Sequence, residues 1–405
     1  MDRTILHCDL NCFFASVELL SLPRLRKLPV AVCGDPASRH GIILAKNERA
    51  KGFGVKTAET VWQAKKKCPE LVLVPPHHQR YREYSKKVNA IYLRFTDLVE
   101  PFGIDESWLD VTGSLHLFGG DPVALADHIR DTVRRELGLT LSVGVSFNKV
   151  FAKLGSDYRK PDATTRIGRD NWRDLLYPLP VGSLLYVGRA AEEALGQYGI
   201  RTIGQLAGVD RGLLLERLGK LGGQLHDYAN GHDPSPVRPW HQKETVKSVG
   251  NGTTFPRNLT TLDQVRAGTA LLSDSVAMRL RRQGLYCGGV QVTLKDPQFR
   301  VISRQKQLAR STHLMREIQA AAMELILSAW KPPSPIRLIT VTAIHLTEEG
   351  ETYCQTDLFA DPEGERRQQR QEKLEQAMDA IRGKFGHDAI AFGRPGERKG
   401  GGTLP

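Results

Sequence analysis

The sequence predicts a multidomain protein with an α/β region, a helical region and a final α+β region. Three observations lead to this prediction: the chain has 405 residues, its hydrophobic periodicity changes along the sequence, and a proline-containing stretch divides it. A chain of this length suffices for two to four domains with separate cores. No apolar run reaches the roughly 18 residues that a membrane span needs, and no signal peptide precedes the first strand. We therefore expect a cytoplasmic protein that does not cross a membrane.

Residues 1–167 form the predicted α/β region. A strand lies within residues 1–12, helical and loop segments follow to about residue 78, and helices alternate with strands from there to residue 167. Residues 98–112 hold two short apolar runs on either side of Gly103-Ile104-Asp105-Glu106. This pattern predicts a hairpin that carries two carboxylates near its bend.

Helical periodicity dominates residues 168–236, where glycine-containing turns recur. A small helical domain is expected there. Prolines at 234, 236 and 239 then interrupt regular structure among polar residues. This composition favours an extended tether, so residues 237–246 are the predicted linker.

Residues 247–350 show the order strand, helix, strand, strand, helix, strand, which is a βαββαβ unit. The six elements are expected near residues 246–255, 262–283, 290–295, 300–308, 314–330 and 336–346. In the fourth element Arg300, Arg304 and Lys306 fall at even spacing, and a strand would project them from one face. Such a face, with Lys247 beside the linker, suits contact with a DNA backbone, while a solvated outer face is the competing interpretation.

The tail, residues 351–405, opens with a polar loop and continues into an amphipathic helix. Leu374, Met378, Ile381 and Phe385 recur there at helical spacing, which predicts one apolar face. The Gly- and Lys-rich residues that follow have the composition of a disordered end.

The composition favours a polyanionic partner. The formal net charge is +12, although acidic membrane surfaces and ribosomal surfaces also attract basic proteins. Aromatic residues make up only 7% of the chain, so phosphate contacts by Lys and Arg are favoured over stacking of bases. Six cysteines without a Cys-x-x-Cys pair are interpreted as free, mostly structural thiols.

Three acidic residues are the candidates for chemistry. Asp9 lies at the end of an alternating strand segment, where a charge needs a partner. Asp105 and Glu106 lie at the predicted bend, which can direct both carboxylates toward one point. Hard oxygen donors suit Mg²⁺, and two such ions about 3.5–4 Å apart can activate a 3′-hydroxyl and stabilise leaving pyrophosphate. Each acid taken alone is more often a surface charge or a cap than a metal ligand.

Three segments resemble the signature blocks of Y-family translesion DNA polymerases, especially the DNA polymerase IV type. They are residues 8–18 (CDLNCFFASVE), 103–110 (GIDESWLD) and 148–161 (NKVFAKLGSDYRKP), and their order and spacing match as well. The resemblance covers about residues 1–350. It implies a right-hand-like polymerase whose parts are a palm (1–11 and 79–167), fingers (12–78), a thumb of helix-hairpin-helix type (168–236) and a βαββαβ little finger (247–350).

The same resemblance implies an activity and its site. The activity is template-directed, low-fidelity synthesis on primer-template DNA, in which a dNTP is joined to the primer 3′-hydroxyl and pyrophosphate is released. Two Mg²⁺ ions would be held by Asp9, Asp105, Glu106 and the main-chain carbonyl of Leu10. All three acids are then catalytic residues.

Aromatic and basic residues complete the nucleotide site that the resemblance implies. Phe14 matches the ring that lies under the deoxyribose and excludes a 2′-hydroxyl, and Phe13 would pack near the same sugar and base. On composition alone both phenylalanines would pass as core residues. Lys160 matches the lysine that binds the β and γ phosphates, against the alternative of a solvated loop lysine.

The fingers depart from the family pattern. Relatives often carry Asn-Tyr-x-x-Arg with Tyr and Arg on the triphosphate, whereas this chain reads Asn47-Glu48-Arg49-Ala50-Lys51. Lys51 supplies charge without the fork of Arg, and Glu48 cannot replace the tyrosine. Either Lys46 or Arg49 could compensate.

Two further sites are expected outside the catalytic blocks. Residues 185–188 (LYVG) resemble a helix-hairpin-helix turn, so amides near Gly188 could face a DNA phosphate, although a plain helix connection fits nearly as well. In the tail, Gln355, Leu358 and Phe359 belong to a peptide (QTDLF) that resembles the motif by which bacterial polymerases dock on the sliding clamp. The alternative is that these residues fold back as a small satellite core.

Two other functions compete with the polymerase. A catalytically silent DNA- or clamp-binding protein would have no need for three acids together with Lys160. A nucleotidyl cyclase, whose fold also uses paired metals, would have no need for the basic βαββαβ unit. We therefore expect a monomeric DNA polymerase that binds primer-template DNA, dNTPs, Mg²⁺ and a sliding clamp.

Overall fold

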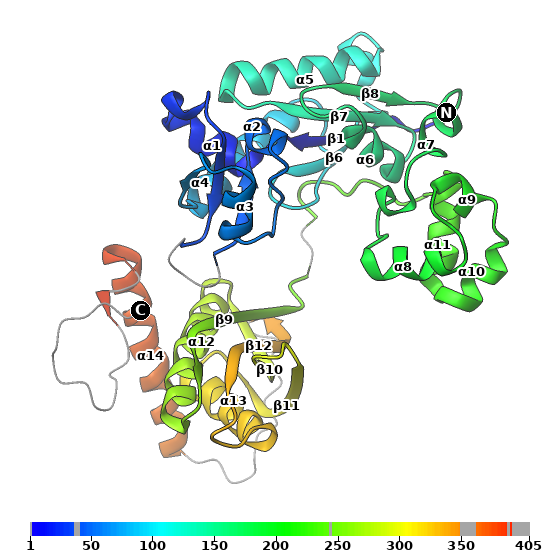
Figure 1. Ribbon diagram of the computed structural model, residues 1–405. Helices are drawn as coiled ribbons and strands as arrows, with labels where there is room; N and C mark the ends of the chain where they lie inside the picture. Colours follow the sequence, from blue (N-terminus) through cyan, green and yellow to red (C-terminus); the bar gives the residue numbers. More distant parts are fainter. Residues whose placement is uncertain (1, 36–40, 243–244, 349–361, 387–388, 391–405) are drawn as a thin grey trace. The chain divides into compact units, whose positions relative to one another are not determined.

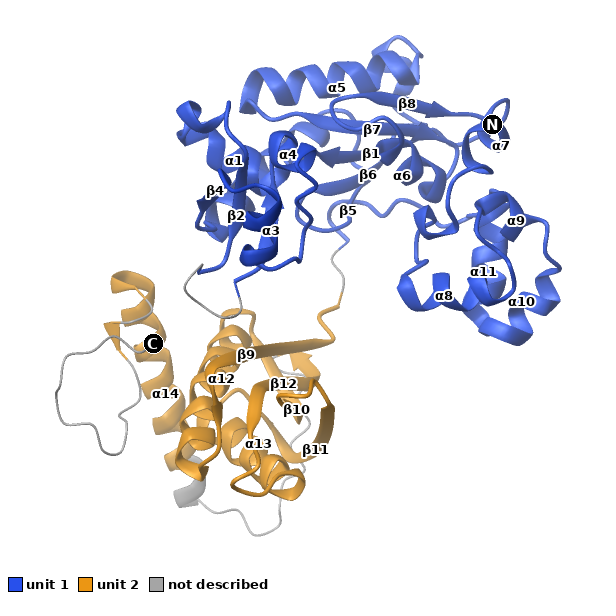
Figure 2. Ribbon diagram, in the orientation of Figure 1, with its two compact units in different colours: residues 1–243 blue, residues 244–405 orange. Residues whose placement is uncertain are grey.

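The structure is a computed structural model that describes residues 2–35, 41–242, 245–348, 362–386 and 389–390 (Figure 1). The chain forms two compact units, Met1–Lys243 and Glu244–Pro405 (Figure 2). Their boundary lies inside the predicted linker. Among the described helices, none is both long and apolar enough to span a bilayer.

A five-stranded sheet is the centre of the first unit. Its strand order is β5-β6-β1-β7-β8, and the strands are Val99–Pro101, Glu106–Asp110, Ile5–Leu10, Leu141–Ser146 and Thr164–Ile167. Central β1 pairs antiparallel with both β6 and β7. The predicted hairpin is confirmed, because β5 and β6 pair antiparallel around a bend in which Gly103 has a φ of +105°.

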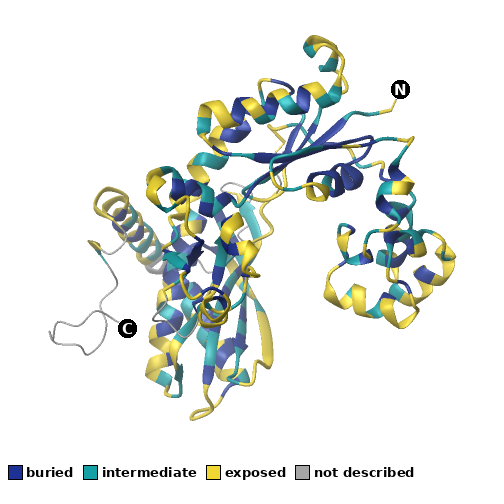
Figure 3. Ribbon diagram, turned by 45° about the horizontal axis from the view of Figure 1, so that its top comes forward, coloured by how far each residue is buried: buried dark blue, intermediate teal, exposed yellow. Residues whose placement is uncertain are grey.

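Alternation along β1 separates its side chains onto two faces of this sheet. Leu6, Cys8 and Leu10 join the core on the side of helix α5 (Pro122–Leu137). Ile5, His7 and Asp9 point to the side of helix α6 (Lys149–Tyr158), where His7 bonds Ser156. Figure 1 shows α5 and α6 on opposite faces, and Figure 3 shows the strands between them buried. Asp9 therefore faces α6 rather than solvent.

Helix α6 lies against β7 at backbone contact. A Cβ added to Gly144 would overlap the carbonyl oxygen of Ala152, and one added to Gly155 would lie 2.9 Å from the Cα of Gly144. Only glycine therefore allows this approach at Gly144. The close packing fixes the side chains of α6 over the strand end that carries Asp9.

Residues 12–78 contain a second, three-stranded sheet of order β3-β2-β4, formed by Ile43–Lys46, Val30–Cys33 and Val72–Val74. The helices of this part are α1, η1, α2 and α3, which span Phe13–Ser21, Pro23–Leu25, Glu48–Gly52 and Val61–Lys67. The next helix, α4 (His78–Tyr92), packs against α1 and α5. Only helices and loops were expected between residues 12 and 78, and this was wrong. Strands of three or four residues are too short to show an alternating pattern.

Short helices make up the rest of the first unit, as predicted for residues 168–236. They are α7, η3, α8, α9, α10 and α11, at Trp172–Leu176, Val181–Ser183, Arg189–Gln197, Ile203–Ala207, Arg211–Leu218 and Lys220–Ala229, while η2 (Leu115–Phe118) precedes α5. Their apolar faces form one core around Leu195, Ile203 and Leu225. The Asn148 side chain ties this region to α6, because its amide donates to the Gly231 carbonyl at 3.0 Å.

The second unit has the predicted βαββαβ order. The elements are β9 (Ser248–Leu259), α12 (Leu262–Arg282), β10 (Leu285–Lys295), β11 (Val301–Thr312), α13 (Met315–Ala329) and β12 (Ile336–Glu348). The four strands form one antiparallel sheet of order β11-β10-β12-β9. Both helices pack on one face of this sheet, where the largest core cluster lies.

The tail helix α14 (Pro362–Phe385) docks on this unit through charges rather than through the predicted apolar face. Met378 is only 5% exposed, but Leu374, Ile381 and Phe385 are exposed. Arg382 instead forms a forked ion pair with Asp274 on α12, with N–O distances of 3.0 and 2.7 Å. The predicted helix is confirmed, but of its four apolar residues only Met378 is buried, because the buried side of the helix is set by these ionic partners.

Candidate active site

Strand pairing brings the three candidate acids together. Asp9 on β1 is the register partner of Glu106 on β6, and Asp105 directly precedes Glu106. The Leu10 amide donates to the Asp105 carbonyl at 3.0 Å, which closes the strand end. Asp9 is only 6% exposed. The sequence-predicted acids and Leu10 therefore lie at one end of the central strands.

Two lysines hold the carboxylates. The Lys160 ammonium lies 2.6 Å from Asp9 Oδ2 and 2.6 Å from Asp157 Oδ1. The Lys153 ammonium, on α6, lies 2.6 Å from Glu106 Oε2. Lys160 thus lies beside the acids, and its triphosphate role stays a prediction, whereas Lys153 was not singled out in the sequence.

His7 is a second missed residue. Its Nε2 lies 3.3 Å from Glu106 Oε2, and its Nδ1 lies 2.8 Å from the Ser156 hydroxyl. Burial lowers the pKa of His7 to about 4, so the imidazole is neutral near pH 7. The signal was available, because His7 lies two residues before Asp9 and alternation places both on one face.

The electrostatics of the acids differ because their surroundings differ. For Asp9, burial and the neighbouring Glu106 charge raise the pKa to about 7, although Lys160 opposes this shift. The pKa of Asp105 is also raised, by burial and then by the Glu106 charge. For Glu106 burial favours a higher pKa, but the contacts with His7 and Lys153 outweigh it and lower the pKa to about 2. Asp9 is therefore only partly ionised near pH 7, and Asp105 ionises at a higher pH than an exposed aspartate.

A divalent metal fits this donor set. Within the described residues, no group of three His, Cys, Asp or Glu side chains already surrounds one point, since Lys160 and Lys153 each hold a carboxylate. The donors are nevertheless all hard oxygens, crowded at one strand end, and burial together with the Glu106 charge raises the pKa of Asp9 and of Asp105. Mg²⁺ prefers such donors and would supply positive charge there.

The aromatic candidates lie just after the same strand. Phe13 is buried, while Phe14 is partly exposed. The Phe14 ring stacks on Tyr81 of α4, with centroids 4.0 Å apart and planes 11° apart. His78 meets the Phe14 ring edge-on at 5.9 Å. Tyr81 and His78 were not singled out in the sequence.

Lys51, the basic candidate in residues 12–78, is already paired with an acidic residue. The Lys51 ammonium lies 2.7 Å from Glu48 Oε1, which also accepts from the Cys12 thiol at 3.0 Å. Lys46 donates to the Thr57 hydroxyl at 2.8 Å. The structure thus places Lys51 on the same helix α2 as the unusual Glu48, and its triphosphate role stays a prediction.

Gly188 is the N-cap of α8, and no side chain caps this helix end. Tyr186, two residues before Gly188, has a φ of +69° and is exposed.

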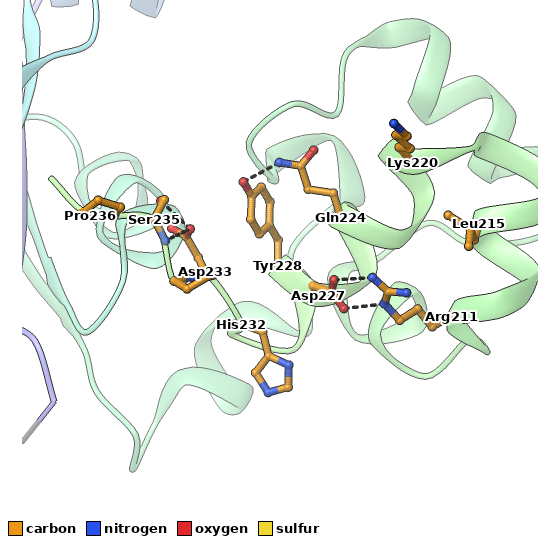
Figure 4. A pocket seen from close by; sticks show the side chains of 11 residues that line it. Arg211, Leu215, Lys220, Gln224, Asp227, Tyr228, His232, Asp233, Ser235 and Pro236 are labelled. Atoms are coloured by element: carbon orange, nitrogen blue, oxygen red, sulfur yellow. Dashed lines mark hydrogen bonds and ion pairs between the residues drawn. The ribbon is translucent and has the colours of Figure 1, made fainter. Parts of the chain in front are cut away.

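A separate surface hollow of about 660 Å³ lies between α10, α11 and residues 232–236 (Figure 4). Its lining includes the Arg211–Asp227 ion pair but none of the three acids, so it is no candidate for the nucleotide site.

The predicted row of basic residues in the second unit is found in part. Arg300 precedes β11 and pairs with Asp296, and Lys306 pairs with Glu324 on α13, which covers the core face. Arg304 shares that side by alternation, whereas the open face carries residues such as Ser303. Arg304 and Lys306 thus share one face of β11 as expected, whereas Arg300 lies outside the strand, and the DNA contact of all three stays a prediction. Lys247 is exposed just before β9.

The proposed clamp peptide with Gln355, Leu358 and Phe359 lies outside the described residues. Its docking role stays a prediction.

Two family models and several relatives match this chain. The model of the impB/mucB/samB family matches residues 8–157, and that of the impB/mucB/samB family C-terminal domain matches residues 246–358. DNA polymerase IV of Acetivibrio thermocellus is 46% identical over 393 residues, with 97% of each chain covered. DNA polymerase IV of Moorella thermoacetica is 39% identical over 405 residues, with 99% of each chain covered. DNA polymerase IV 1 of Bacillus subtilis is 36% identical over 392 residues, which cover 97% of this chain and 93% of the relative.

A solved structure has the same fold. A Y-family DNA polymerase chimera of Dbh and Dpo4 matches with a TM-score of 0.74 and 21% identity, over 85% of this chain and 100% of that one. The sequence matches span both units at identities well above those of chance similarity. The chain therefore belongs to the impB/mucB/samB family and is a DNA-directed DNA polymerase of the translesion Y family, of the DNA polymerase IV type.

Proposed function

We propose that Asp9, Asp105, Glu106 and the main-chain carbonyl of Leu10 hold two Mg²⁺ ions for nucleotidyl transfer from a dNTP to a primer 3′-hydroxyl. The observation that carries this proposal is the β1–β6 register, which sets Asp9 opposite Glu106 beside Asp105. When bound, the metal ions activate the hydroxyl and stabilise the leaving pyrophosphate. Asp9 and Asp105, whose pKa values are raised, bind as carboxylates once that positive charge is present.

Lys160 has a second role in this proposal. Its ammonium contacts Asp9 and Asp157 from a residue directly after α6. A dNTP triphosphate brings strong negative charge to the same place, so the ammonium can exchange a carboxylate for β and γ phosphate oxygens. Lys153 meanwhile keeps Glu106 ionised and oriented.

Phe14 is the proposed sugar-selecting residue, with Phe13 supporting it from the core. The ring of Phe14 is backed by Tyr81 and leaves part of its surface exposed next to the acids' strand end. A backed ring resists displacement, so it excludes a 2′-hydroxyl by contact. Lys51 is the proposed triphosphate contact of the fingers once it leaves Glu48.

The parts of the chain follow the family's division in this proposal. The five-stranded sheet serves as palm, residues 12–78 as fingers, residues 168–236 as thumb, and the βαββαβ unit as little finger. Gly188 would offer helix amides to a DNA phosphate. Four basic residues of the second unit would add positive charge for the DNA backbone: Lys247, Arg300 and, on the edge strand β11, Arg304 and Lys306. A monomeric state and a cytoplasmic location stay predictions from the sequence.

Extension of a primed template with Mg²⁺ and dNTPs tests the metal site. Asp105→Ala or Glu106→Ala should abolish extension while primer-template affinity stays within a few-fold, because the carboxylates are needed for the chemical step. The exposed Asp131→Ala on α5 is the matched control and should extend normally. Near wild-type extension by either active-site variant would refute the assignment.

Sliding-clamp docking by Gln355, Leu358 and Phe359 is tested separately. Two adjacent apolar residues in a polar segment can fill a hydrophobic pocket and so tether a polymerase to DNA. Leu358→Ala/Phe359→Ala should leave clamp-free extension intact and remove stimulation by the cognate clamp. Equal stimulation of variant and wild type would exclude this role, and loss of basal extension would support the packing alternative.

A further inference from the structure

Glu18 is a buried carboxylate outside the catalytic group. It lies on α1 and its side chain is 1% exposed. Three donors from the start of α4 reach it: the Tyr81 hydroxyl at 2.5 Å, His77 Nδ1 at 3.0 Å and Arg80 Nη1 at 3.3 Å. Burying a carboxylate is costly without such partners. The cluster therefore joins α1, the helix that carries Phe14, to the start of α4.

The Tyr81 hydroxyl is fixed from two sides. It donates to Glu18 and accepts from the backbone N–H of His77 at 3.0 Å. Burial raises the pKa of Tyr81, and the hydrogen bond to Glu18 raises it further, so the hydroxyl stays protonated and keeps its donor role. Because both bonds hold the far end of the ring, they set the ring plane.

That ring plane is the surface on which Phe14 rests. The Phe14 and Tyr81 rings are nearly parallel at 4.0 Å, and His78 meets both of them edge-on, at 5.9 and 5.7 Å. His77, the N-cap of α4, makes no side-chain cap and points its ring to Glu18 instead. The position of the first turn of α4, and with it the backing of Phe14, therefore depends on one carboxylate.

We propose that Glu18 is a positioning residue for sugar selection, which acts through Tyr81 on Phe14. The inference rests on the proposed role of Phe14 in excluding the 2′-hydroxyl. A steric filter depends on where the blocking ring lies to within tenths of an ångström, because the contact energy changes steeply at that range. Glu18 fixes that place without touching the nucleotide.

Tyr81→Phe is the sharpest test, because it keeps the ring and its stack and removes only the hydroxyl. We expect the ratio of kcat/KM for a dNTP to kcat/KM for the matching rNTP to fall by about tenfold, as the ring gains freedom. A merely structural role would lower both values in parallel and leave the ratio unchanged. Tyr84→Phe, on the same helix with its ring against Lys87, is the matched control and should keep the wild-type ratio.

Glu18→Gln gives an independent measurement. The amide oxygen can still accept from Tyr81, but the charge that holds His77 and Arg80 is lost. We expect a smaller fall in the ratio than for Tyr81→Phe, and no further fall when the two changes are combined, because both act through one link. Should Glu18→Gln not fold, the Tyr81→Phe result decides alone.

Phe14→Ala separates this inference from the proposal on which it depends. If Phe14→Ala lowers the ratio while Tyr81→Phe and Glu18→Gln leave it at the wild-type value, the positioning role of Glu18 is excluded and the filter stands. If Phe14→Ala leaves the ratio unchanged, Phe14 is not the filter. If Tyr81→Phe lowers the ratio in the wild type but not in the Phe14→Ala background, the inference is supported.

Discussion

The docking of the tail helix α14 on the second unit can be tested by removing one arginine. Arg382 is 4% exposed, forms a forked pair with Asp274 and donates from Nε to the Ile390 carbonyl at 3.0 Å. Arg382→Ala leaves the buried Asp274 carboxylate without this partner. Breaking a buried pair from one side costs about 3–5 kcal/mol.

The apolar contribution to docking is smaller than this cost. Met378 is the apolar side chain that the described part of α14 buries most fully, and burying one methionine contributes about 1.5–3 kcal/mol. The second ionic contact, from Arg281 to Glu375 and Asp379, remains in the variant. We therefore expect α14 to stay docked for most of the time but to open more often, by roughly a hundredfold for a loss of about 3 kcal/mol.

Hydrogen exchange of the α14 amides measures this opening directly. Protection factors along α14 should fall by about two orders of magnitude in Arg382→Ala, while those of β10 and β12 stay close to wild type. The exposed Arg370→Ala on the same helix is the matched control and should leave the α14 amides protected. Unchanged protection in Arg382→Ala would refute the view that ion pairs, rather than apolar contact, hold this helix.

Three further predictions concern the nucleotide site, the first sheet and DNA binding. Lys160→Met should lower kcat/KM for dNTPs by about tenfold to a hundredfold, because a hydrogen bond to a charged group contributes roughly 1.5–3 kcal/mol. The exposed Lys86→Met is the control and should leave kcat/KM unchanged. If single-nucleotide incorporation is unchanged in Lys160→Met, Lys160 does not bind the triphosphate. Gly144→Ala should lower the free energy of unfolding of the first unit by about 2–3 kcal/mol, because its methyl group meets the Ala152 carbonyl, and an unshifted denaturation midpoint would contradict that packing. A chain that ends at Lys243 should lose much of the salt dependence of DNA affinity if the second unit carries phosphate contacts, and an equal slope of log affinity against log salt would place those contacts in the first unit.

Much of the fold could be predicted because the patterns involved are local. The βαββαβ unit was expected from changes of period alone, and the boundary near Lys243 from three prolines and polar neighbours. The hairpin of β5 and β6 was expected because two apolar runs flank a bend that contains Gly103. Asp9, Asp105 and Glu106 could be identified as candidates because they are charged residues at the end of a predicted strand or at a predicted bend.

The partners of the site residues could not be predicted, because they lie far away in the sequence. Glu18 meets Tyr81 across 63 positions, and Lys153 meets Glu106 across 47. Such contacts depend on strand register and on how closely α6 approaches β7. Gly144 permits this approach, but a glycine in the sequence does not by itself predict it. His7 is the exception, since alternation from Asp9 already placed it on the right face.

The sequence by itself determined the order of the elements and the identity of the acids, since periodicity and residue type act over one or two turns of chain. The tertiary structure decided what each side chain faces. It paired Lys306 with Glu324 of α13, and it docked α14 through Arg382 rather than through Leu374 and Ile381. The physical reason is that a local pattern gives a side chain's direction relative to its own backbone, whereas the packing of other elements decides which direction is buried and which charge finds a partner.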